Sequence, residues 1–181
     1  LGNTRLGIGD PTILDGLALA ILGDRSKRKL LEKAYNETSD LGLMGKTLKV
    51  GGLREVKKLK VTVGRPIRSE LCERLPTPDK VFEKMDALVG ASLRGVHATL
   101  KYDGFRVQIH KNGKDVRMFS RNLEDMTHMF PELIEGTLRQ VKAKTAILDT
   151  EALAYQTESE EFLPFQETTK RRRKYNIEEM A

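Results

Sequence analysis

Cysteine is almost absent from this sequence, which contains only Cys72. A disulfide within the chain is therefore excluded, and a reducing compartment inside the cell is the simplest interpretation, either the cytoplasm of a prokaryote or the nucleus of a eukaryote. We expect Cys72 to be a packing residue. Long apolar runs are also missing: the longest candidate, residues 13–22, is far shorter than the roughly 20 residues of a membrane span and contains Asp15 and Gly16. The first residues show no secretory signal pattern.

Charge is abundant, at 32% of residues, and unbalanced: the net charge is +6 and the pI is about 9.4. A basic excess suits a polyanionic partner such as nucleic acid, although a solvated basic face produces the same balance. Since 39% of the residues are hydrophobic, the chain can build a core. It begins with Leu1 rather than methionine, so we expect a piece of a longer protein, with room for one domain or for parts of two.

Apolar periodicity predicts helices in the first third of the chain. Asp10-Pro11 is expected to place an N-cap and a first helical proline at the start of one helix, and residues 26–37 form the next. Thr38-Ser39-Asp40 is expected to cap a short third helix, and Gly51-Gly52 to break the chain after it. The residues that this pattern turns inward include Leu14, Ala18, Ile21, Leu30, Leu31 and Tyr35.

The pattern changes to strands after a further helix that starts at Thr77-Pro78 and turns Val81, Phe82, Met85 and Leu88 inward. Asn112-Gly113 predicts a two-residue hairpin turn. This is an α+β architecture: a helical piece over residues 1–64, then an antiparallel sheet with flanking helices over residues 65–181. The predicted strands cover residues 96–100, 105–109, 116–119 and 146–155, and further helices begin at Phe130-Pro131 and Pro164.

One lysine follows an apolar run and opens a tight turn, Lys101-Tyr102-Asp103-Gly104-Phe105-Arg106. Lysine is a covalent nucleophile when burial or nearby cations keep it deprotonated. Gly104 permits a close approach of a ligand, and Arg106 offers a planar fork of donors to phosphate or ribose. On its own, the segment fits a hairpin with solvated charges at least as well. The sequence has no Gly-rich loop ending in Gly-Lys-Ser/Thr, so a P-loop NTPase is not supported.

Two carboxylates lie on one face of an apolar strand, since Asp149 and Glu151 are alternate residues. Carboxylates in such a strand are costly unless they are paired or bind a cation, and phosphoryl transfer commonly uses Mg²⁺ held by carboxylates. Asp149 is the weaker of the two candidates. The three histidines lack metal-ligand spacing and are expected to have surface or hydrogen-bonding roles: His97, His110 and His128.

Three segments in this order resemble the nucleotidyltransferase core of ATP-dependent DNA ligases of the archaeal and eukaryotic replicative type. They are Lys101-x-Asp103-Gly104-x-Arg106, Ser120-Arg121-Asn122-Leu123-Glu124-Asp125 and Asp149-Thr150-Glu151-Ala152. Leu163-Pro164-Phe165-Gln166 and the basic run after it also match. The resemblance implies the helical tail of a DNA-binding domain over residues 1–64 and the first half of an adenylation domain over residues 65–181.

The resemblance also implies roles for single residues. Lys101 would take AMP from ATP, Arg106 and Arg121 would bind the nucleotide or the 5′-phosphate of a nick, and Glu151 would bind ribose or Mg²⁺. Thr99 stands where these ligases usually have a glutamate that reads adenine, which leaves the nucleotide preference open. The basic run either contacts the DNA backbone or is a solvated helix face: Lys170, Arg171, Arg172 and Arg173.

The implied reaction of the full-length protein seals nicked double-stranded DNA with ATP and Mg²⁺, and a sliding clamp is a candidate partner. The later motifs of the family have no counterpart before Ala181, so the isolated chain is expected to be weakly active or inactive. Two alternatives stay open. One is a non-catalytic DNA-binding fragment or degenerate ligase, which Thr99 and the early end suggest. The other is a ligase of the same superfamily that acts on RNA ends.

Overall fold

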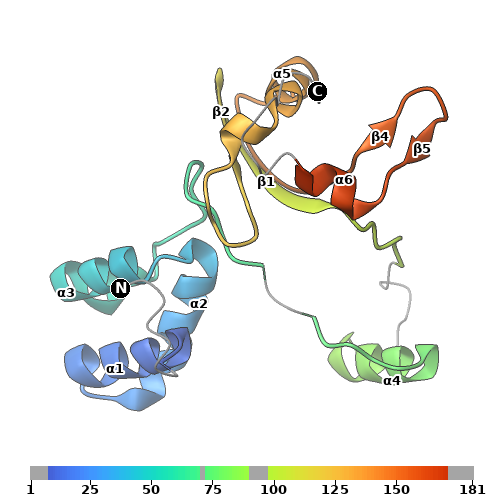
Figure 1. The fold of residues 1–181 in the computed structure, drawn as a ribbon. Helices are drawn as coiled ribbons and strands as arrows, with labels where there is room; N and C mark the ends of the chain where they lie inside the picture. The colour runs from blue at the N-terminus through green and yellow to red at the C-terminus, as the bar shows by residue number, and fades with distance from the viewer. Residues whose placement is uncertain (1–7, 70–71, 90–97, 171–181) are drawn as a thin grey trace.

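The computed structural model describes residues 8–69, 72–89 and 98–170. Helices come first along the chain and an antiparallel sheet follows (Figure 1), so the predicted combination of helices and antiparallel strands is confirmed. Within the described residues, no helix combines the length and the apolar character that crossing a membrane requires.

The first helices form one bundle, the helical unit, which consists of α1 (Asp10–Leu22), η1 (Arg25–Lys27), α2 (Arg28–Thr38) and α3 (Leu41–Val56). Asp40 caps α3 as predicted, because its Oδ1 accepts the backbone N–H of Leu43 at 2.8 Å. The predicted break is also present, since Gly52 has a non-helical φ of 66° within α3. All three α-helices contribute to one buried cluster: Leu14, Ala18, Leu31, Ala34, Tyr35, Met44, Leu48 and Val56.

Two details of the helical unit differ from the prediction. Gly9, not Asp10, occupies the N-cap of α1. Asp10 lies in the first turn instead, where its carboxylate accepts a hydrogen bond from the Tyr35 hydroxyl. Burial and this hydrogen bond raise the pKa of Tyr35 to about 12. Ile21 and Leu30, predicted to point inward, are each 40% exposed, because the apolar stripe of each helix is wider than the surface that its neighbours cover.

Helix α4 (Pro78–Val89) stands apart from the helical unit (Figure 1). Two of its predicted inward residues, Phe82 and Leu88, are 48% and 71% exposed, so that part of the prediction is wrong. The spacing of apolar residues does define one face of α4, but the described neighbours leave that face largely uncovered. Cys72, predicted to pack, is exposed as well.

The main sheet has the strand order β2-β1-β3, and both pairs are antiparallel. The two-residue turn between the first two strands is formed by Gly113 and Lys114, one residue later than predicted, because Asn112 pairs with Asp115. The strands are β1 (Phe105–Asn112), β2 (Asp115–Phe119) and β3 (Thr145–Ala152). The remaining elements are η3 (Thr127–Met129), α5 (Pro131–Gln140), the small hairpin β4 (Tyr155–Gln156) and β5 (Glu161–Phe162), and α6 (Phe165–Lys170).

Two predicted strands differ in extent. Residues 98–100 have no regular secondary structure, and residues 96–97 lie outside the described residues. The predicted strand 146–155 ends at Ala152, and Tyr155 begins the separate hairpin. Gly104 contacts the end of β3, so residues 98–104 reach the sheet as a loop rather than as a fourth strand.

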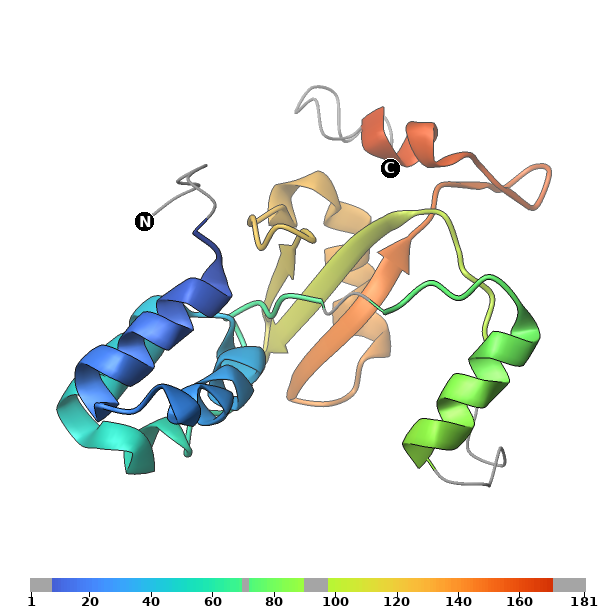
Figure 2. The ribbon, with the colours of Figure 1, turned by 90° about the horizontal axis from the view of Figure 1, so that it is seen from below.

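The two faces of the sheet have different coverings. One face packs under α5 and η3 and holds the second buried cluster: Val107, Ile109, Val116, Met118, Met126, Met129 and Phe130. Residues 64–68, which we call the junction segment, cross the other face (Figure 2) and contact Gln108 and His110 there. As a result β1 is buried on both faces from Val107 to Lys111.

Candidate functional site

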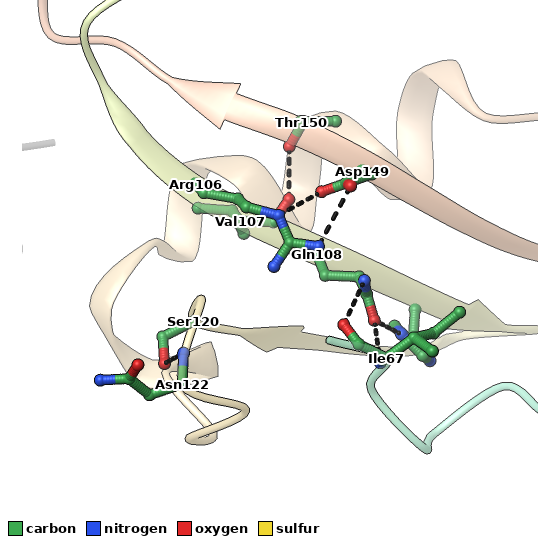
Figure 3. Close-up of polar contacts among 9 residues, drawn as sticks. Ile67, Arg106, Val107, Gln108, Ser120, Asn122, Asp149 and Thr150 are labelled. Atoms are coloured by element: carbon green, nitrogen blue, oxygen red, sulfur yellow. Dashed lines mark hydrogen bonds and ion pairs between the residues drawn. The ribbon is translucent and has the colours of Figure 1, made fainter. Parts of the chain in front are cut away.

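Arg106 and Asp149 form the best-defined polar pair of the site. The Nε of Arg106 lies 2.8 Å from Asp149 Oδ1, and its Nη2 donates to Asp149 Oδ2 at 3.1 Å (Figure 3). This two-point contact fixes the plane of the guanidinium. The side chain of Arg106 is only 15% exposed, whereas that of Asp149 is 57% exposed. Among the described residues, the buried Nη1 of Arg106 has no hydrogen-bond partner, so its N–H groups are available to donate to a ligand oxygen.

Glu151 is held by the turn that follows Lys101. Its Oε1 accepts the backbone N–H of Gly104 at 3.2 Å, and Arg106 is its register partner across the β1–β3 pair. Gly104 is packed too closely for any side chain, because a Cβ there would lie 2.4 Å from the carbonyl oxygen of Ala152. The sequence predicted that Asp149 and Glu151 share a face, and the register confirms it: they pair with Gln108 and Arg106, which alternate along β1.

Ser120 organises the loop that carries Arg121. The buried Ser120 Oγ accepts the backbone N–H of Asn122 at 3.2 Å (Figure 3). It also accepts the backbone N–H of Glu124 at 3.2 Å. Leu123 has a φ of 67°, a left-handed conformation that is costly for leucine and is held by these contacts. Arg121 and Asn122 remain exposed, so the loop presents their side chains to the solvent.

Asp125 closes the same loop. Its Oδ1 accepts the N–H and the hydroxyl of Thr127, at 3.0 and 2.7 Å. Partial burial alone would raise the pKa of Asp125, but the hydrogen bonds from Thr127, with nearby Arg117 and His128, hold it below its usual value. Asp125 is therefore an ionised structural group at the edge of the site.

Two cavities meet at Arg106 and Glu151. The larger, of about 680 Å³, brings these two side chains together with Arg121. The smaller, of about 390 Å³, brings them together with Lys101 and Thr99. The larger cavity is also lined by Gly104, Ser120, Asn122, Met126, His128 and Phe165.

Lys101 and Thr99 lie on an irregular, exposed segment rather than at the end of a strand. Within the described structure, the amine of Lys101 makes no hydrogen bond or ion pair, and the residue lines the smaller cavity. The next residue, Tyr102, is anchored by an edge-to-face ring contact with Phe162 at 6.0 Å. The lysine side chain is thus unpaired within the described structure, while its neighbours Tyr102 and Gly104 are held by contacts.

The described residues contain no cluster of three or more side chains that could hold a metal ion. Mg²⁺ requires only one or two carboxylates when phosphates and water supply its other ligands. Glu151 fits that requirement, whereas the oxygens of Asp149 are engaged by Arg106. Lys170 lines neither cavity and pairs with Glu167 at 2.6 Å. The other predicted DNA contacts, Arg171 to Arg173, lie outside the described residues.

Comparison with known proteins identifies the family. A model described as "ATP dependent DNA ligase domain" matches residues 70–181, more than half of the chain. The chain belongs to the ATP-dependent DNA ligase family. The "Probable DNA ligase" of Dictyoglomus turgidum is 47% identical to it over 181 residues, which cover 100% of the chain and 30% of that protein.

Other DNA ligases are similar over nearly the same span. "DNA ligase 2" of Thermofilum pendens is 45% identical over 178 residues, which are 98% of the chain and 28% of that protein. The "DNA ligase" of Cenarchaeum symbiosum is 43% identical over 178 residues, which are 98% of the chain and 29% of that protein. The chain therefore spans less than a third of the length of the curated relatives that it matches.

The structure defines roles for several residues that the sequence left undefined. Ser120 was one residue of a matching segment, but its role is to hold the Arg121 loop through two backbone N–H groups. Asp149 was expected to bind a cation or to pair, and it pairs with Arg106. Outside the site, no local pattern indicated that Gln108 and His110 are buried, because what covers them is a segment more than 40 residues upstream. Of the two roles expected for His110, the structure shows hydrogen bonding and not a surface position.

Proposed function

We propose that this chain is the part of an ATP-dependent DNA ligase that carries the nucleophile, and that the nucleophile is Lys101. Membership of the ligase family supports the reaction class. The observation that carries the residue assignment is the arrangement of one cavity, where Lys101 lies with Arg106 and Glu151. Lysine attack on a phosphate requires a nearby cation and hydrogen-bond donors for the developing charge, and Arg106 provides both.

The proposed first step transfers AMP from ATP to Lys101. The unprotonated Nζ attacks the α-phosphorus, a P–N bond forms, the bond from that phosphorus to the bridging oxygen breaks, and pyrophosphate leaves. The nitrogen gives its remaining extra proton to solvent. In the second step, a 5′-phosphate oxygen at the nick attacks the same phosphorus and the P–N bond breaks. The 3′-hydroxyl then attacks the 5′-phosphate, and AMP leaves as the backbone is joined.

The other residues around the two cavities have supporting roles in this proposal. The unpaired Nη1 of Arg106 donates to a nucleotide oxygen. Glu151 binds the ribose or contributes a ligand to Mg²⁺, which supplies charge neutralisation at the phosphates when it is bound. Arg121, exposed at the rim of the larger cavity, binds the ribose or the 5′-phosphate of the nick. Thr99 contacts the nucleotide from the smaller cavity.

We further propose that residues 1–64 are the end of a DNA-binding domain and that residues 65–181 begin the adenylation domain. Support comes from the basic residues exposed on α3 and in the segment after it, which suit the phosphates of nicked duplex DNA. They are Lys46, Lys49, Arg54, Lys57, Lys58 and Lys60. A sliding clamp remains a candidate partner of the full-length protein.

The test is covalent transfer of AMP, measured as intact mass after incubation with ATP and Mg²⁺. It uses the full-length protein to which we propose that this chain belongs, and then the chain alone. The wild type is expected to gain the mass of one AMP and Lys101→Ala to gain none. Lys114→Ala, which removes an exposed lysine in the β1–β2 turn, is the matched control and should react like the wild type.

Each outcome separates the alternatives. Equal labelling of Lys101→Ala and wild type would refute the assignment of the nucleophile. A full-length protein that binds nicked duplex but gains no AMP would be the non-catalytic module. A parallel incubation with GTP tests whether Thr99 has altered the nucleotide preference, and a comparison of nicked DNA with nicked RNA separates the two kinds of ligase.

A further inference from the structure

Two buried polar side chains lie on the sheet face opposite α5. Gln108 is 3% exposed and His110 is 1% exposed. They alternate with Arg106 along β1, so all three point to the same face. Buried polar groups are costly unless they are hydrogen-bonded. Neither side chain belongs to the candidate site, so their burial requires its own explanation.

The junction segment covers both side chains and satisfies them. The backbone N–H of Gly64 donates to His110 Nδ1 at 2.8 Å, which places the proton of a neutral ring on Nε2. That Nε2 lies 2.9 Å from Gln108 Oε1, to which it donates. Gln108 Oε1 also accepts the N–H of Ile67 at 2.8 Å, and its Nε2 donates to the Ile67 carbonyl at 3.2 Å (Figure 3).

This network is specific in its geometry. Gln108 contacts both backbone groups of Ile67, as a neighbouring strand would, although the junction segment is not a strand. Gly64 has a φ of 86°, a conformation that other residues rarely adopt. The Phe119 ring makes an edge-to-face contact with the His110 ring, with 5.0 Å between the ring centroids. Replacing either polar side chain leaves backbone groups of the junction segment without partners.

The same segment is also attached to the helical unit. The backbone N–H of Arg68 donates to Ser39 Oγ at 2.8 Å, and its guanidinium pairs with Asp10 at 3.2 Å. Arg65 pairs with Asp40 at 3.5 Å. The junction segment is therefore bonded to the helical unit on one side and to β1 on the other, and β1 carries Arg106 two residues before Gln108.

We propose that Gln108 and His110 are positioning residues that fix the helical unit relative to the Lys101 site through the junction segment. The inference rests on the proposed function, in which the helical unit binds duplex DNA and the sheet transfers AMP. Formation of lysyl-AMP needs only the nucleotide site. Transfer of AMP to a nick also needs the DNA to be held at the correct distance, so the two residues act on the second step and not on the first.

The test measures the two steps separately in the full-length protein. His110→Phe preserves a ring against Phe119 and removes both hydrogen bonds. Transfer of AMP to a nicked duplex, followed in a single turnover from preformed lysyl-AMP, is expected to slow on the order of tenfold or more, because small misplacements of reacting groups are costly. The rate of lysyl-AMP formation is expected to stay within about twofold of wild type.

Two further variants separate positioning from loss of stability. His110→Asn places an amide oxygen near the Nδ1 position, so it can accept the N–H of Gly64 and should restore much of the transfer rate. Ile109→Ala is the matched control, since it weakens the core on the opposite face of β1 without touching the junction segment. The control is expected to leave the ratio of the two rates unchanged.

A structural measurement tests the positioning directly, whatever the activity. Spin labels incorporated at the exposed residues Lys33 of α2 and Glu135 of α5 report the distance between the helical unit and the sheet. The distance distribution should broaden in His110→Phe and stay narrow in Ile109→Ala. An unchanged distribution in His110→Phe, or equal slowing of both steps, would overturn the proposal. A wild type that forms no lysyl-AMP but shows the expected distances would refute the proposed function alone.

Discussion

A single methyl group at Gly104 should disrupt the site. In Gly104→Ala the new Cβ would lie 2.4 Å from the Ala152 carbonyl oxygen, 2.4 Å from a methyl group of Leu153 and 2.9 Å from Glu151 Cγ. The leucine can rotate away, but the carbonyl belongs to the end of β3, so backbone must move. Overpacking of this kind costs about 1–3 kcal/mol.

Displacement of the Gly104 turn from β3 should also slow the formation of lysyl-AMP. The Gly104 N–H group donates to Glu151 Oε1 at 3.2 Å, and Glu151 lines both cavities. Separating the turn from β3 breaks that bond and moves Lys101, three residues earlier. We therefore expect the rate of lysyl-AMP formation to fall by about tenfold or more, beyond what the loss of stability explains. Urea unfolding measures the stability, and single-turnover labelling with ATP measures the rate.

Gly136→Ala is the matched control. Gly136 lies within α5, and a Cβ there meets no atom within 4 Å. Alanine is a better helix former than glycine by about 0.8–1 kcal/mol, so this variant should be more stable than wild type and equally active. Both substitutions replace glycine by alanine, but Gly104→Ala should lower the free energy of unfolding and Gly136→Ala should raise it. If Gly104→Ala matched the wild type in stability and labelling rate, the close packing of the turn against β3 would not matter and the reasoning would fail.

Three further predictions concern other parts of the site and the junction. Ser120→Ala leaves the N–H groups of Asn122 and Glu124 without their acceptor, which should lower the free energy of unfolding by about 1–2 kcal/mol in urea and raise the KM for nicked DNA. Unchanged values for both quantities would contradict this role. Asp149→Asn weakens the pairing that orients Arg106; since Asp149 is 57% exposed, stability should change by less than about 1 kcal/mol while the KM for ATP rises. Burial lowers the pKa of His110 below its ordinary value of 6.5, so between these two values the unfolded chain binds a proton that the folded chain does not. The free energy of unfolding should therefore fall as the pH decreases below about 6.5, and His110→Phe should lose this dependence on pH; equal pH profiles of the two proteins would refute the prediction.

Local sequence patterns predicted most of the elements because their causes are local. The Asp40 cap, the break at Gly52 and the hairpin near Asn112 depend on a few adjacent residues. The error of one residue at Asp10 has the same origin, since aspartate is favoured both at the N-cap and in the first helical turn.

Burial was harder to predict because it depends on distant residues. The apolar spacing of α4 correctly indicates a helix with one apolar face, yet Phe82 and Leu88 are exposed because the pattern does not specify what covers that face. The reverse happens at β1. Its alternate polar residues Gln108 and His110 indicate a solvent-facing side, but the junction segment covers it.

The candidate site also combines features that the local sequence predicts with features that depend on distant residues. Residue type and order identified Lys101, Arg106, Arg121 and Glu151 as candidates, and the structure places three of these four around each cavity. The contacts that hold Arg106 and Glu151 follow from the register of β1 with β3, which no short motif encodes. Their catalytic and binding roles stay predictions until the variants are measured.

The two buried clusters also imply an order of folding. The residues of the helical unit that pack together end at Leu59, so its core can form while the ribosome is still making β1. The sheet must wait for Ala152, because β1 pairs with β3 at sequence separations of up to 47 residues, as for Phe105 and Ala152. During that interval Val107 and Ile109 lack the contacts that β3 contributes to their buried cluster. The nascent chain is therefore most vulnerable to aggregation after the β1–β2 hairpin has emerged and before β3 has followed it.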